Sequence, residues 1–191
     1  MSEHEYFGVV SSALSIFAYL IYCRTCLLGE TKPHVFSWVV WAVLSGVIFV
    51  VQIQQGAGPG SWVMATSVVF CFLITLFALF RGERAITPGD WVAFIGALVV
   101  VPVWQLTDNP QLAVILATLI DALAYYPTYR KSWLRPREEN VWIYALEVPK
   151  MSFALAALDH WSWTVALYPA FVLAANFCLA LLIGFRRKAL A

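Results

Sequence analysis

The chain has 191 residues, of which 62% are apolar and 12% are charged, and its mean hydropathy is +0.78. A soluble protein of this size needs far more charge to cover its surface, so this composition excludes a soluble globular domain. The formal net charge is only +1 and no basic run suits nucleic acid, so the lipid bilayer is the expected large-scale partner.

Apolar blocks occupy nearly the whole chain and are separated by short polar or turn-forming segments. The first residues, MSEHEY, lack the basic start of a secretory signal peptide, so we expect the first block to be retained. Thr87 and Pro88 predict the start of the fourth helix. A helix needs about 20 apolar residues to cross a bilayer, which predicts seven spans. The expected spans lie at about 6–28, 35–53, 62–80, 91–106, 112–129, 141–158 and 163–185.

The basic residues predict the orientation of these spans. The chain has twelve Lys and Arg residues, and all but one lie in alternate loops and the C-terminal tail. The positive-inside rule then predicts the N-terminus outside and the C-terminus inside. The exception is Lys150, in the middle of span six. The others are Arg24, Lys32, Arg81, Arg84, Arg130, Lys131, Arg135, Arg137, Arg186, Arg187 and Lys188.

Two parts of the chain match each other without a gap. Ala124 and Tyr125 lie 106 residues after Ala18 and Tyr19, and an offset of 105 aligns span three with span seven. One unit is therefore predicted to occur twice. With a single span between them, the two copies face the same way, as parallel repeats about an axis along the membrane normal.

The predicted fold is an all-α integral membrane protein with seven transmembrane helices in a 3+1+3 arrangement. Residues 1–191 form a single membrane domain. Its expected parts are a first three-helix repeat (6–85), a linker helix (86–108) and a second three-helix repeat (109–188).

This layout resembles the SWEET and PQ-loop transporters. The stretch YPTYRKS at 126–132 is similar to a PQ-loop with Thr128 in place of glutamine, whereas the first repeat departs further, with Ile21 and Tyr22 at the Pro-Gln position. PnuC-type vitamin transporters share this fold and carry Trp-x-x-Trp motifs, to which Trp38-Val-Val-Trp41 in span two is similar. The resemblance implies a small-solute carrier with a central pocket between its two halves.

The resemblance also bears on Asn176. An asparagine in the last helix of each repeat lines the sugar pocket of SWEET-type carriers, and Asn176 occupies that place in span seven. Span three has Cys71 at the matching position, so the asparagine pair is broken. The alternative for Asn176 is a hydrogen bond between helices.

Three charged residues fall inside the predicted spans. Asp121 and Lys150 lie near mid-bilayer, where a charge costs about 2.5–3.5 kcal/mol on insertion scales, and such residues usually mark functional sites. We expect an Asp121–Lys150 pair between consecutive spans, with Glu147 as a competitor for the lysine because it lies three residues earlier on the same face. These three residues either contact the solute, carry a proton, or only stabilise the packing of the helices.

Aromatic and proline residues complete the set of candidates. Tyr125 lies one turn from Asp121 on the same face, so it and the deep Trp38 and Trp41 are expected either to line the pocket or to pack in the bundle. Prolines inside spans kink helices and can act as hinges or as static bends. The candidate hinges are Pro127, Pro149 and Pro169.

These features favour a transporter that moves a sugar, nucleoside or vitamin-like solute by alternating access. The alternative is a seven-helix receptor or sensor, including a chromophore-binding protein with Lys150 as the attachment point. No nucleophile or metal set accompanies the charges, and Cys23-x-x-Cys26 has no second pair, so we expect no enzyme activity, metal or cofactor. A homo-oligomer is possible, and the small size suggests the inner membrane of a bacterium.

Overall fold

A computed structural model describes residues 1–30, 32–82, 86–138 and 141–190, without the side chains of 93, 126, 127, 130, 131 and 138. This part of the chain is helical and contains no strand, which confirms the predicted all-α fold. Its seven α-helices begin and end close to the predicted spans. They are α1 (Glu3–Leu27), α2 (Val35–Gln54), α3 (Trp62–Arg81), α4 (Pro88–Thr107), α5 (Pro110–Leu134), α6 (Val141–Ala156) and α7 (Trp163–Ala189), with short 3₁₀ turns η1 (Gly58–Ser61) and η2 (Pro136–Glu138).

The predicted start of the fourth helix is confirmed. The Thr87 side chain accepts a hydrogen bond from the backbone N–H of Asp90, and the Asp90 carboxylate accepts one from the backbone N–H of Thr87. This reciprocal capping box satisfies two N–H groups that the first turn would otherwise leave unpaired. Pro88 fills the first helical position, where no N–H is required.

Five of the helical segments are long and apolar enough to cross a membrane: α1, α2, the combined η1–α3 segment, α4 and α7. Helix α6 has only 16 residues, and the apolar part of α5 is the short stretch Pro110–Tyr125. These two helices carry the buried Asp121 and Lys150. Several membrane-length helices with exposed apolar side chains make the chain a membrane-associated protein.

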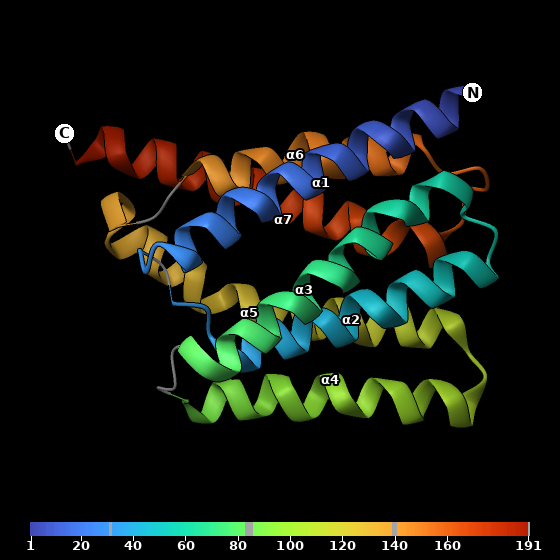
Figure 1. The fold of residues 1–191 in the computed structure, drawn as a ribbon, viewed down its shortest axis with the longest axis horizontal. Helices are drawn as coiled ribbons and strands as arrows, with labels where there is room; N and C mark the ends of the chain where they lie inside the picture. The colour runs from blue at the N-terminus through green and yellow to red at the C-terminus, as the bar shows by residue number, and fades with distance from the viewer. Residues whose placement is uncertain (31, 83–85, 139–140, 191) are drawn as a thin grey trace.

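The helices run alternately in opposite directions along one axis (Figure 1). We call one end of the bundle the N-terminal end; it holds the N-terminus and the connections α2–α3, α4–α5 and α6–α7. The opposite end, which we call the basic end, holds the other three connections and the C-terminus with Arg186, Arg187 and Lys188.

Two helix triplets have the same internal packing. Helix α3 packs against both α1 and α2, and α7 packs against both α5 and α6. Between described residues, α1 and α2 make at most marginal contact, and the same holds for α5 and α6. The triplets join through α1 with α6 and through α2 with both α5 and α7, while the described residues of α4 pack mainly on α2 and α5. The largest apolar core lies around α2 and includes the fully buried Leu44 and Ile48.

Candidate functional site

A cavity of about 310 Å³ lies between the two helix triplets. Six helices contribute to its wall, and no described residue of the connecting helix α4 does. The volume is at the lower end of the range for small-molecule sites. The lining residues are Ala18, Tyr19, Tyr22, Trp38, Trp41, Ser45, Met64, Ser67, Cys71, Asp121, Ala124, Tyr125, Thr128, Ile143, Tyr144, Glu147, Lys150, Met151, Tyr168, Val172 and Asn176.

All seven residues singled out as candidate binding residues lie on the wall of this one cavity: Trp38, Trp41, Asp121, Tyr125, Glu147, Lys150 and Asn176. They come from α2, α5, α6 and α7, so the fold brings together positions more than 100 residues apart in the chain. The candidate hinges Pro149 and Pro169 lie inside α6 and α7. Pro127 lies in α5, and its side chain is outside the described part of the chain.

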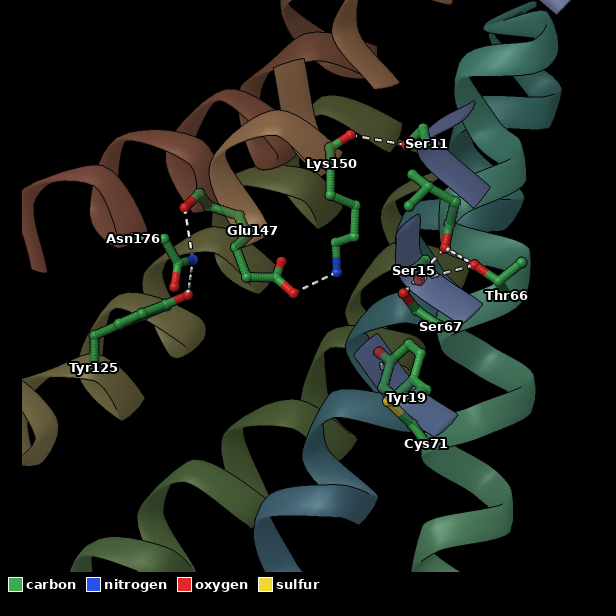
Figure 2. A network of polar contacts seen from close by, with 12 residues as sticks. Ser11, Ser15, Tyr19, Thr66, Ser67, Cys71, Tyr125, Glu147, Lys150 and Asn176 are labelled. Carbon is green, nitrogen blue, oxygen red and sulfur yellow. Dashed lines mark hydrogen bonds and ion pairs between the residues drawn. The ribbon is translucent and has the colours of Figure 1, made fainter. Parts of the chain in front are cut away.

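Lys150 is held against Glu147 on the same face of α6. Its Nζ donates to Glu147 Oε1 at 2.6 Å and lies 5.7 Å from the centroid of the Tyr19 ring (Figure 2). The Ser11 hydroxyl of α1 donates to the backbone carbonyl of Lys150 at 2.8 Å. Lysine and glutamate three residues apart are neighbours on a helix. The pair is therefore local to α6, and Ser11 ties this turn to the other triplet.

The expected Asp121–Lys150 pair does not form. Asp121 Oδ1 instead accepts a hydrogen bond from Trp41 Nε1 of α2 at 3.3 Å, and the Asp121 side chain is buried. The reason lies in the packing: α5 and α6 follow each other in the chain, but α7 packs against both, and α5 faces α2. The lysine is captured by the nearer carboxylate on its own helix.

Aromatic rings form much of the remaining wall. Trp38 is at the centre of one group: its ring lies 4.8 Å from Tyr22 and 5.1 Å from Trp41, measured between centroids. Tyr19 lies 6.3 Å from Trp38 and stacks on Phe70 at 4.9 Å. Such ring packing fixes the side chains in defined orientations. The cavity therefore has aromatic walls near Asp121.

The wall of the cavity follows the sequence repeat. Most lining residues fall into pairs related by the offset of 106 residues, or 105 in the third helix of each triplet. The pairs are Ala18/Ala124, Tyr19/Tyr125, Tyr22/Thr128, Trp38/Tyr144, Trp41/Glu147, Ser45/Met151, Ser67/Val172 and Cys71/Asn176. Asp121 and Lys150 stand outside this pattern, because their counterparts Ser15 and Leu44 do not line the cavity.

One polar contact occurs in both triplets at matched positions. Asn176 Nδ2 donates to the Tyr125 hydroxyl at 2.7 Å, and the Tyr19 hydroxyl lies 3.5 Å from Cys71 Sγ in hydrogen-bonding geometry (Figure 2). In each case a tyrosine of the first helix meets a polar side chain of the third. Cys71 therefore takes the place of the missing second asparagine and makes the matching contact with a tyrosine, as a weaker hydrogen-bonding group.

Sequence reasoning missed part of the wall. Tyr19, Tyr22, Tyr144 and Tyr168 line the cavity but were not singled out. For Tyr19 the signal was present, because it is the repeat counterpart of Tyr125. Tyr168 is buried on α7 beside Pro169, and nothing in the sequence distinguishes it from other aromatic residues in the spans.

Asn176 links α7 to α5, so its replacement by leucine should weaken this contact. Asn176 also donates to the Val172 carbonyl at 2.8 Å, and its side chain is buried. We expect Asn176→Leu to lower the free energy of unfolding by about 1 kcal/mol, the usual size of such interhelical bonds. Cys178→Leu, at an exposed position on the same helix, is the control. Equal thermal melts for both variants would show that the Asn176 contact adds no stability.

Near the N-terminal end of the bundle, the η1 turn is in close contact with the C-terminal part of α6. A Cβ on Gly60 would lie 2.5 Å from Leu158 Cδ2 and 3.0 Å from the Ala154 carbonyl oxygen. The backbone N–H of Asp159 donates to the Ala57 carbonyl at 3.1 Å, and Ala57 and Leu158 share a small buried cluster. The cavity instead extends toward the basic end, where Ile143 in the first turn of α6 lines it.

The described residues contain no group of three or more His, Cys, Asp or Glu side chains arranged to hold a metal ion. The four cysteines are free thiols, and Cys71 is the one that lines the cavity. The cavity wall offers charged side chains, hydrogen-bonding groups and aromatic rings.

Comparison of the chain with protein-family models, with curated proteins and with solved structures found no match.

Proposed function

We propose that this protein is a membrane transporter that moves a small polar solute by alternating access around the central cavity. The observation that carries the proposal is a cavity enclosed between two helix triplets and lined at matched positions of both. A site between two such repeats is the arrangement that carriers use, because rocking one half against the other exposes it to either side. The tight contact at the N-terminal end and the wall near the basic end fit one state of that cycle.

The proposed architecture has seven spans in a 3+1+3 arrangement of parallel repeats, with the N-terminus outside and the C-terminus inside. The same pattern of helix packing within the two triplets supports the repeats. The basic residues of the C-terminal tail and the 1–2 loop lie at one end of the bundle, which supports the orientation. Helix α6, at 16 residues, is about 24 Å long, so it spans the hydrocarbon core only with its flanking residues.

The resemblance to SWEET and PQ-loop transporters, including the PnuC type, is part of this proposal. It rests on the 3+1+3 layout, the YPTYRKS stretch at 126–132, and Asn176 on the cavity wall. We place the protein in the inner membrane of a bacterium as a multi-pass protein. The bilayer and the solute are the expected partners.

A seven-helix receptor is the second candidate, and one observation favours it. The Lys150 side chain is buried, lines the cavity and has its ammonium 5.7 Å from the centroid of the Tyr19 ring, an arrangement that also suits a ligand held in place without transport. Attachment of a chromophore to Lys150 is a special case, and purified protein would then show a visible absorbance band.

Counterflow separates the two candidates. Purified protein is first screened by thermal shift with glucose, uridine, riboflavin, alanine and choline, because a ligand that binds the folded form raises the melting temperature. Proteoliposomes are then loaded with the stabilising compound and given a labelled trace of it outside. We expect the label to accumulate transiently inside. A compound that stabilises the protein but shows no more uptake than protein-free liposomes would identify a receptor.

A further inference from the structure

One carboxyl group on the cavity wall has no basic partner among the described residues. Among the described residues on its wall, Asp121, Glu147 and Lys150 are the charged ones. Lys150 and Glu147 neutralise each other at 2.6 Å. Asp121 is only 3% exposed, and none of the ion pairs found between described residues includes it. One carboxylate is therefore left without a counter-charge in the centre of an apolar bundle.

The contacts of Asp121 favour its charged form. Trp41 Nε1 can only donate, so its bond at 3.3 Å places a positive hydrogen at Asp121 Oδ1. A hydrogen bond of this kind stabilises a carboxylate. A buried carboxylate in a membrane span still needs a positive partner, and such residues face the interior for that reason.

The walls beside Asp121 suit an organic cation. Trp38 and Trp41 meet edge to face, 5.1 Å apart, and Tyr22 closes one side. The faces of aromatic rings attract cations, and several rings together recognise ammonium groups. This interaction already occurs on the cavity wall, where Lys150 lies beside the Tyr19 ring. An anionic solute would meet no unpaired cation among the described wall residues.

We propose that the solute is a small organic monocation, with its charge set against Asp121 and its carbon groups on the aromatic walls. This inference rests on the proposed transport function, since it takes the cavity as the solute site. The volume of about 310 Å³ limits the solute to a small molecule. The alternative partner for Asp121 is a proton, in which case the solute itself is neutral.

Two probe pairs of similar shape and different charge test the proposal. They are choline with 3,3-dimethylbutan-1-ol, and N-methylpyridinium with pyridine at a pH where pyridine is uncharged. Binding is measured by thermal shift and calorimetry on the full chain. The variants are Asp121→Asn, which removes the charge with little change of shape, and Asp159→Asn, which removes an exposed carboxylate outside the cavity.

We expect at least one cation to bind while its neutral partner does not, and Asp121→Asn to weaken that binding by at least about tenfold. Asp159→Asn should bind it as the wild type does. Equal binding of charged and neutral partners, unchanged binding by Asp121→Asn, or no binding of either cation would each overturn the proposal. If a neutral compound binds and shows counterflow while neither cation binds, the proposal of a cationic solute is wrong and the transport proposal stands. If a cation binds but shows no counterflow, the transport proposal is wrong and the cation site stands.

Discussion

Replacement of Lys150 by methionine is expected to lower the free energy of unfolding by about 3 kcal/mol. Methionine keeps much of the apolar stem but removes the ammonium, which leaves Glu147 unpaired against the cavity. Removing one partner of a buried ion pair costs more than the pair contributes, because an uncompensated charge remains. We expect a value at the lower end, because the Glu147 side chain is 23% exposed and its charge is therefore only partly buried. Equilibrium unfolding in mixed detergent measures the loss.

The double variant Glu147→Gln with Lys150→Met is the matched control. It removes both charges, so most of the stability lost in Lys150→Met should return. A double variant that is no more stable than the single one would show that the two side chains are not coupled. If the double variant is stable and still shows counterflow, the pair has only a structural role.

Replacement of Gly60 by valine is expected to prevent closure of the N-terminal end. A Cβ at this position would lie 2.5 Å from Leu158 Cδ2 and 3.0 Å from the backbone oxygen of Ala154. The Leu158 side chain can move, but the Ala154 backbone cannot move without shifting α6. Forcing extra carbon atoms into a packed contact costs about 1–3 kcal/mol. Because this cost falls on the closed state, the equilibrium should shift toward a state open at that end.

The readout for Gly60→Val is the reaction of a cysteine at position 124, on the cavity wall, with a membrane-impermeant maleimide supplied at the N-terminal end. We expect the rate to rise at least about tenfold, since about 1.4 kcal/mol corresponds to a tenfold change in an equilibrium. Gly46→Ala in α2 is the control, because a Cβ there meets nothing within 4 Å. A rate that is unchanged in Gly60→Val would show that this contact does not control access.

The sequence was sufficient for the helices because their signal is local. Apolar blocks bounded by turn residues and by the Thr87 cap placed each helix to within a few residues of its observed ends. The repeat also predicted relations in space: Tyr19 and Tyr125 occupy matched positions on the cavity wall. Charged residues inside a span, such as Asp121, could also be identified from the sequence alone, because a charge in the membrane is costly and usually marks a functional site.

The partner of each charge could not be predicted in this way. Neighbours in the chain were taken as neighbours in space, but α7 packs against both α5 and α6, so Asp121 meets Trp41 of α2 instead of Lys150. The aromatic wall was missed for a related reason. A span that is apolar all round does not show which face is turned toward the cavity, so Tyr168 could not be separated from lipid-facing aromatics.

Access to the cavity from both sides of the membrane is the most direct test of the transport proposal, and it needs no knowledge of the solute. Ala124→Cys, in a background with the four native cysteines replaced by serine, places one thiol on the cavity wall. Phe177→Cys, at an exposed position of α7, is the lipid-facing control. We expect an impermeant maleimide to label Cys at 124 from either side of oriented vesicles, and the control from neither. Labelling of position 124 from one side only, with and without a bound ligand, would contradict alternating access.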